Sequence, residues 1–178
     1  MFGPGAAARA RSARDIASRF LEKGLQTIVF APSRLATEVL VTYLKDMFES
    51  KPGSEGVIRG YRGGYLPLKR REIERGLRDG SVLGVVSTNA LELGIDIGAL
   101  DVSVMLSYPG TVASTWQQAG RSGRRGSTSA AVLVLNSTLH SQSDARSSTE
   151  IASIRSNASA AQGRNSSVST TLSRAASG

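Results

Sequence analysis

The 178-residue sequence predicts an α/β fold, in which a parallel sheet is covered by helices on both faces. Two observations support this. Short apolar runs, typical of buried strands, alternate with longer segments that have apolar residues at helical spacing. The connections between them are short, which favours crossover units that return each strand parallel to the previous one. The apolar runs cover residues 26–31, 57–59, 82–86, 102–106 and 130–135.

The N-terminal third predicts one strand between two helices. Residues 1–12 are rich in Gly, Ala and Arg, and we expect them to form a flexible arm. A helix should cover residues 15–23, because its apolar residues share one side and Gly24 follows it. After the strand at 26–31, Ser33 suits the N-cap of an amphipathic helix that runs to about Ser50.

The rest of the ordered region continues the alternation. A glycine-rich turn over 62–65 follows the second strand. Pro67 suits the first position of a helix that turns its arginines outward and ends before Gly80. The later elements are strands at 82–86 and 102–106, a short helix at 114–119 and a strand at 130–135. The Ser-, Ala- and Thr-rich segment 137–178 lacks aromatic residues, and we expect a disordered tail.

Ligands in such folds bind at the carboxyl ends of the strands. Polar residues follow three of the predicted strands, at Ser33 and Arg34, at Thr88 and Asn89, and at 109–111. We therefore expect a binding site at this edge of the sheet.

The chain carries a net charge of +8, and many of its basic residues crowd residues 59–78. This favours an anionic polymer such as nucleic acid as partner. The alternative is a solvated helix face, because Glu72 and Glu74 can pair with these arginines at helical spacing.

Composition excludes several site types. There is no cysteine, and the single histidine, His140, lies in a polar segment, so we predict no metal site. No apolar run is long enough to span a bilayer, and the first residues do not resemble a secretory signal. We expect a cytoplasmic protein with no membrane partner.

Two motifs are the most informative part of the chain. In residues 117–125, Arg121 and Arg124 stand three apart, each preceded by glycine, and two planar cations directed at one point match phosphate oxygens. Upstream, residues 85–96 run from a buried strand into a polar turn that ends in Asp96. Together they predict an arginine-finger element and a loop that grips phosphates.

Three segments resemble the C-terminal RecA-like motor domain of superfamily 2 (DEAD/DEAH-type) helicases. They are residues 28–34 (motif IV), 88–97 (motif V) and 117–124 (motif VI). Arg62 and Arg70 stand where this family has its His-Gly and Gln-x-x-Arg element, although Arg62 replaces the His and Pro67 the Gln. Segments 61–67, 90–98 and 108–111 look most like the mitomycin-repair-factor subfamily of DNA helicases, which has RecQ-like fungal relatives. The resemblance covers residues 13–136 and implies a RecA-like three-layer fold.

The resemblance also implies roles for individual residues. Arg121 and Arg124 would be catalytic arginine fingers that reach ATP on a partner RecA-like domain. The nucleotide would further contact Asp96, Gly94, Gln117 and Gly120. Strand phosphates would be held by Ser33, Arg34, Arg62, Arg70, Thr88 and Asn89. The structural alternatives are helix caps, surface ion pairs and an Arg-rich helix end; Trp116 could stack on a base, but we favour a core or interface position.

The chain has no Gly-x-x-x-x-Gly-Lys-Ser/Thr loop and no Asp-Glu-x-His or Asp-Glu-Ala-Asp run. ATP and its Mg²⁺ would therefore be bound mainly by a missing first RecA-like domain, and we expect half a motor, either a fragment or a truncated product. The leading hypothesis is the second domain of an ATP-dependent helicase or translocase acting on single-stranded or duplex DNA. The alternatives are a non-catalytic nucleic-acid-binding module and an inactive fragment.

Overall fold

A computed structural model describes residues 4–50, 53–88, 100–123, 129–137, 148–156 and 169–175. Its strands form one seven-stranded sheet in the order β2-β3-β1-β4-β5-β6-β7. Strands β1 to β5 run parallel, which confirms the predicted class, while β6 and β7 are antiparallel. The strands are β1 (Thr27–Phe30), β2 (Ile58–Tyr61), β3 (Gly84–Ser87), β4 (Val102–Leu106), β5 (Ser129–Ser137), β6 (Ser148–Ser156) and β7 (Ser169–Ala175).

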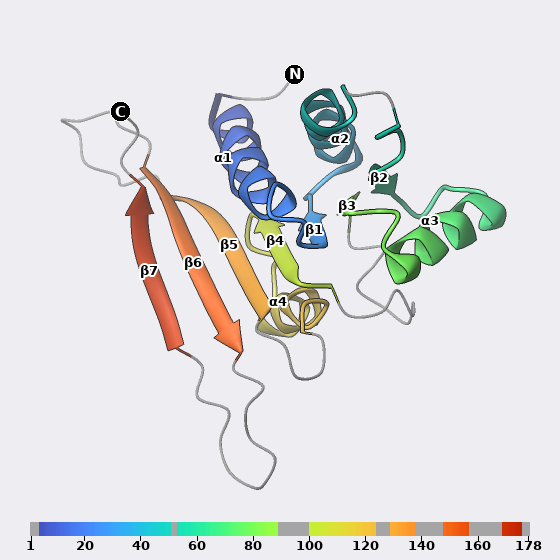
Figure 1. The fold of residues 1–178 in the computed structure, drawn as a ribbon. Helices are drawn as coiled ribbons and strands as arrows, with labels where there is room; N and C mark the ends of the chain where they lie inside the picture. The colour runs from blue at the N-terminus through green and yellow to red at the C-terminus, as the bar shows by residue number, and fades with distance from the viewer. Residues whose placement is uncertain are drawn as a thin grey trace, which may run out of the picture.

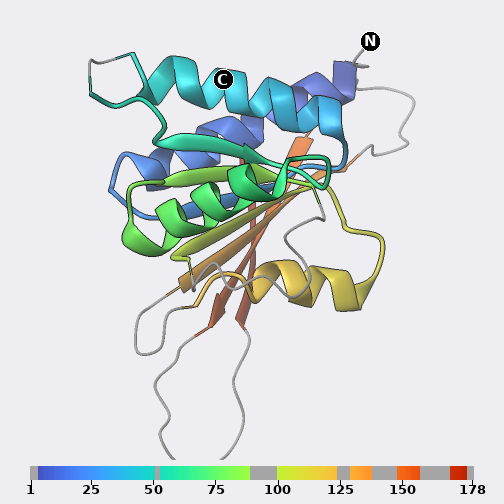
Figure 2. The same ribbon diagram turned by 90° about the vertical axis from the view of Figure 1, so that its right-hand side faces the viewer.

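Helices cover both faces of the parallel strands. Figures 1 and 2 show α1 (Pro4–Leu21) and α2 (Arg34–Phe48) on one face, with α3 (Pro67–Asp79) and α4 (Val112–Ala119) on the other. Each face has its own hydrophobic core. Because successive strand residues point to opposite faces, Val29 packs beneath α1 and α2 while its neighbour Ile28 packs on the α3 side. Burial on both faces explains why these strands are continuously apolar.

Local sequence signals set the ends of the central helices. The Ser33 hydroxyl accepts a hydrogen bond from the Ala36 amide at 3.2 Å, so the predicted N-cap of α2 is confirmed. Pro67 lies in the first turn of α3, and Gly80 ends that helix with a φ of 83°, a left-handed conformation that suits glycine. Both boundaries match the sequence prediction.

The structure differs from the predictions at both ends of the chain. Helix α1 begins at Pro4, where we expected a flexible arm over residues 1–12. Alanine is the best helix former, and Ala10 and Ala13 are buried against the sheet, where larger side chains would not fit. In the predicted tail 137–178, β6 pairs with the outer edge of β5 and β7 pairs with β6, so backbone pairing extends the sheet there.

The strand register places the candidate site. Tyr61, Ser87, Phe30 and Met105 form one row across β2, β3, β1 and β4. The residues that follow this row therefore share one edge of the sheet, which we name the carboxyl edge; the opposite edge is the amino edge. No helix in the described part of the chain combines the length and the apolar character of a membrane span.

Candidate nucleic-acid and nucleotide sites

Three of the predicted phosphate-binding segments lie side by side at the carboxyl edge. Arg62 follows β2, Thr88 follows β3, and Ser33 with Arg34 follows β1, which is the order of the strands in the sheet. Ser33 and Arg34 are exposed, while Arg62 and Thr88 are half-buried. The parallel register therefore gathers residues that are up to 55 positions apart in the sequence (33 to 88) into one row.

The turn between β2 and α3 concentrates cations around Tyr65. The Arg62 guanidinium lies 5.1 Å from the centre of the Tyr65 ring, and the Lys69 ammonium lies 4.9 Å from it. Arg70 donates a hydrogen bond from Nη2 to the carbonyl of Gly63, which ties the start of α3 to the glycine-rich turn. Arg70, predicted from the sequence, thus lies beside Arg62.

Arg62 also forms an ion pair, with 2.9 Å between its Nη1 and Glu38 Oε1. More than a third of each side chain is exposed to solvent (38% and 49%), and a solvent-accessible pair of this kind contributes about 1 kcal/mol or less. Arg62 therefore takes part in a surface ion pair of the kind that the structural alternative expects. A pair this weak does not prevent the guanidinium from binding a phosphate instead.

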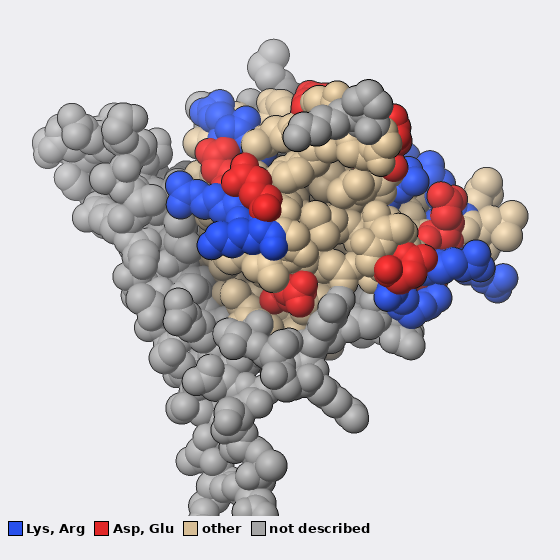
Figure 3. All heavy atoms as spheres, in the orientation of Figure 1, with Lys and Arg blue, Asp and Glu red and all other residues tan. Residues whose placement is uncertain are grey.

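Glu72 and Glu74 of α3 turn toward β2 rather than along their own helix. Glu72 lies 3.7 Å from the Arg59 guanidinium, and Glu74 accepts a hydrogen bond from the Tyr61 hydroxyl at 2.9 Å. Burial, together with the Glu74 hydrogen bond, raises the pKa of Tyr61 to about 12. Figure 3 shows cationic and anionic side chains interspersed over the α3 end of the molecule, at the right of the view.

Helix α4 connects the two edges of the sheet. It begins after β4, at the carboxyl edge, where the Thr111 hydroxyl accepts a hydrogen bond from the Ser114 amide at 3.0 Å. Just beyond its other end, the Arg121 carbonyl accepts a hydrogen bond from the Leu100 amide at 3.0 Å, next to the first residue of β4. Arg121 therefore lies at the amino edge, far from Ser33 and Arg34.

The predicted site residues thus separate into two groups. The described residues assigned to strand phosphates lie at the carboxyl edge, whereas Gln117, Gly120 and Arg121 lie on and beyond the second half of α4. Gln117 is exposed and Arg121 is half-buried. Four further predicted residues lie outside the described part of the chain: Asn89, Gly94, Asp96 and Arg124.

The glycines of the arginine motif have structural roles. A Cβ on Gly120 would lie 3.0 Å from the Trp116 carbonyl oxygen, so a larger residue would be crowded where the chain leaves α4. Gly123 has a φ of 128°, which other residues rarely adopt. Trp116 itself is 51% exposed on α4, so a core position for it is wrong and the interface alternative stays a prediction.

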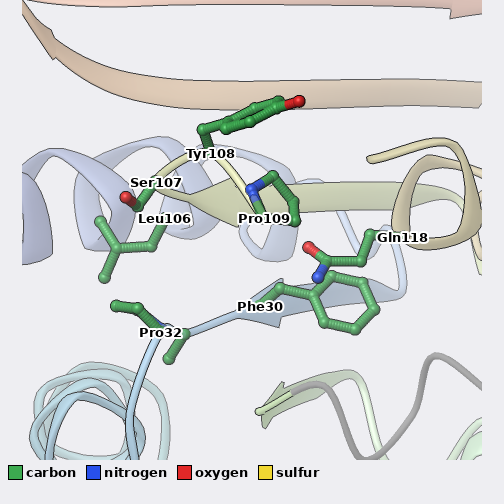
Figure 4. A pocket seen from close by; sticks show the side chains of 8 residues that line it. Phe30, Pro32, Leu106, Ser107, Tyr108, Pro109 and Gln118 are labelled. Atoms are coloured by element: carbon green, nitrogen blue, oxygen red, sulfur yellow. The ribbon is translucent and has the colours of Figure 1, made fainter. Parts of the chain in front are cut away.

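A small pocket opens between the ends of β1 and β4, with a volume of about 40 Å³. Figure 4 shows Phe30 and Gln118 directed toward it from one side of the β4 end, and the Tyr108 ring on the opposite side. Ser107, at the mouth of this pocket, has a φ of 93°, the only positive value among the described non-glycine residues. Sequence reasoning missed this feature, because nothing in the residue types around Ser107 indicates a left-handed backbone.

Among the described residues, no group of three His, Cys, Asp or Glu side chains is close enough to hold a metal ion. The polar groups that the structure does bring together are hydroxyls, guanidiniums and backbone amides. These are donors suited to anions, and phosphate in particular.

Comparison with known proteins agrees with this geometry. The helicase conserved C-terminal domain family matches residues 12–126. The uncharacterized ATP-dependent helicase YprA of Bacillus subtilis is 58% identical over 124 residues, which cover 70% of this chain and 16% of YprA. The chain therefore spans about a sixth of the length of this relative.

Solved structures support the same assignment. The DUF1998 helicase MrfA bound to DNA and AMPPNP superposes with a TM-score of 0.64 at 54% identity, covering 70% of this chain and 17% of MrfA. Domain 2 of the DEAD-box helicase Mss116p, bound to an RNA duplex, has a TM-score of 0.60 at 21% identity, covering 72% of this chain and 50% of that one. The second match establishes the RecA-like fold of DEAD-box C-terminal domains. The chain belongs to the helicase conserved C-terminal domain family.

Proposed function

We propose that the chain is the second motor domain of an ATP-dependent DNA helicase or translocase. Its carboxyl edge holds the phosphates of one DNA strand, through Ser33, Arg34, Arg62, Arg70, Thr88 and Asn89. The far end of α4 and the loop before β4 serve the nucleotide, with Arg121 and Arg124 as the fingers that reach its γ-phosphate. Asp96, Gly94, Gln117 and Gly120 contact the rest of the nucleotide.

The observation that supports this proposal most strongly is the separation of the two groups of residues. A helicase motor must bind its DNA strand and its nucleotide at different places and connect the two sites through a rigid element. Here the strand-binding side chains end the parallel strands, while Arg121 lies at the opposite edge, hydrogen-bonded through its backbone to Leu100.

In this proposal, ATP and Mg²⁺ bind mainly to a first RecA-like domain in another part of the motor. Closure of the two domains brings delocalised guanidinium charge to the γ-phosphoryl oxygens, where negative charge develops in the transition state. Opening after hydrolysis shifts the hold on the strand. Of the relatives that share more than half of their aligned residues with this chain, YprA is an ATP-dependent helicase and MrfA was solved with DNA and a nucleotide analogue, which favours DNA over RNA in this proposal.

The test combines this chain with the first RecA-like domain of a close relative and measures DNA-stimulated phosphate release. Arg121→Ala and Arg124→Ala should each lower the turnover rate steeply, since an arginine finger contributes about 10³–10⁵ in GTPases. Arg11→Ala, on the exposed side of α1, is the matched control and should leave the rate unchanged. Equal turnover by the finger variants and the parent chain would exclude the finger assignment and leave the non-catalytic nucleic-acid-binding module as the better description.

A further inference from the structure

Along the carboxyl edge, the segment after β4 continues the row of proposed strand-binding residues. The order of the strands puts the segment after β2 first, then those after β3 and β1, and the one after β4 last. Pro32 and Tyr108 line the same pocket, so the end of β1 and the end of β4 are direct neighbours. A DNA strand that lies across Arg62, Thr88 and Arg34 would therefore reach Tyr108 next.

The chemistry of this last segment differs from the rest of the row. Residues 102–120 contain no Lys, Arg, Asp or Glu, so this segment offers no side-chain charge to a phosphate. Tyr108 instead presents an aromatic ring that is 48% exposed. An aromatic ring beside a cationic track suits a nucleobase, because every base has a face that stacks on such a ring.

The backbone explains why Tyr108 is exposed. Met105 and Leu106 alternate between the two cores, and continued alternation would place Tyr108 beneath the α1–α2 layer together with Leu106. The left-handed conformation of Ser107 breaks the alternation at this point. The Ser107 amide still donates to the Val134 carbonyl of β5 at 3.0 Å, which fixes the turn to the sheet. Strained backbone of this kind is concentrated at functional sites.

The other candidate aromatic rings are less suitable. Tyr65 has Arg62 and Lys69 against its ring, and Tyr43 lies on α2 with Arg14 at 5.7 Å. Trp116 lies within α4 rather than in a segment that directly follows a strand. No described residue stacks on Tyr108 or forms a hydrogen bond with its side chain.

We propose that Tyr108 is a base-stacking residue at the β4 end of the strand-binding edge, and that it holds one unpaired nucleobase of the bound DNA. This inference rests on the proposed function, since it assumes that the strand lies along the carboxyl edge. The other assigned residues contact phosphates, whereas Tyr108 would contact a base. Such a contact tolerates any sequence but requires that the base be present.

The test measures binding of the full 178-residue chain to two fluorescein-labelled oligomers, a deoxythymidine 12-mer and an abasic 12-mer with the same phosphates. Tyr108→Ala should weaken binding of the deoxythymidine oligomer about fivefold or more, and should leave the abasic oligomer unaffected. Tyr108→Phe should behave as the parent chain. Tyr43→Ala, which removes an exposed tyrosine from α2, should affect neither oligomer.

A second readout observes the base directly. With 2-aminopurine placed at successive positions of the 12-mer, the parent chain and Tyr108→Phe should quench its fluorescence at one position, and Tyr108→Ala should not. An unchanged thermal midpoint by circular dichroism shows that the alanine variant is folded.

Each other outcome overturns the inference in a distinguishable way. If the parent chain binds neither oligomer, both the proposed strand-binding edge and the stacking role of Tyr108 are wrong. If both oligomers bind but Tyr108→Ala loses nothing, the edge remains and the stacking role is wrong. Equal losses for both oligomers would make Tyr108 a support for the turn, and a loss confined to association with the first motor domain would make it a protein contact.

Discussion

The contacts of an arginine in this domain, rather than its residue type alone, determine what its removal would change. Arg62 and Arg70 both belong to the proposed strand-binding edge, yet one forms an exposed ion pair with Glu38 and the other is hydrogen-bonded to the Gly63 carbonyl. Removing Arg62 should therefore remove one phosphate contact alone, whereas removing Arg70 also frees the glycine-rich turn. The two arginines are not equivalent targets for mutation.

Tyr61 gives a pH-dependent prediction at this scale. Burial and the Glu74 hydrogen bond raise its pKa from 10.0 to about 12, so the folded chain favours the neutral phenol. The resulting stabilisation is fully present below pH 10 and is lost as the pH rises toward 12, by about 2 to 3 kcal/mol in all. Urea denaturation of the parent chain and of Tyr61→Phe across this range should show the difference in unfolding free energy shrinking with pH. A difference that stays constant would contradict the raised pKa.

At the scale of elements, the start of α2 combines a structural and a proposed functional role in one residue. Ser33 caps the helix and also stands in the row of strand-binding residues. The helix N-terminus adds partial positive charge at the same place, which favours a phosphate. The helix-cap alternative for Ser33 is therefore correct, and it is compatible with binding.

Two substitutions at Ser33 separate these roles. Ser33→Ala should lower the unfolding free energy by about 1 kcal/mol, because the Ala36 amide loses its partner. Ser33→Asp should keep the cap and the stability but weaken DNA binding, because a carboxylate repels the phosphate. Chemical denaturation and oligonucleotide binding on the same samples check both. Unchanged DNA affinity of Ser33→Asp would place the strand elsewhere.

The elements themselves were largely predictable, because local signals set them. Pro67, Gly80 and Ser33 mark boundaries through their own backbone and side-chain chemistry. The N-terminal extension of α1 was not predictable, since its small alanines read as a flexible arm until the sheet against which they pack is known. The exposure of Tyr108 was not predictable either, because it depends on the conformation of Ser107.

The whole molecule is organised as two edges of one sheet, and this is where sequence reasoning was least complete. The resemblance to superfamily 2 helicases implies which residues would serve DNA and which the nucleotide, and the carboxyl edge was predicted from the strands. The position of Arg121 at the amino edge follows only from the path of α4 across the sheet. The sequence alone does not distinguish a helix that crosses a face of the sheet to the opposite edge from one that stays at the edge where it begins.

At this scale we predict that the isolated chain hydrolyses no ATP. The sequence contains neither a Gly-x-x-x-x-Gly-Lys-Ser/Thr loop nor a paired-acid run for magnesium, so the proposed arginine fingers would have no bound nucleotide to act on. Phosphate release should stay at background with and without single-stranded DNA. Robust DNA-stimulated hydrolysis by the pure chain would refute the assignment of ATP binding to another domain.

Helix α4 has a mechanical consequence. Its eight residues make a rod about 12 Å long, with Tyr108 and Thr111 before its first turn and Arg121 just past its last. Buried Ala119 and the hydrogen bond from Ser103 Oγ to the Gln118 carbonyl anchor it near Arg121. Under the proposed function, this anchored end of α4 lies near the nucleotide, and a small tilt of the helix there would give a larger displacement at the strand-binding edge.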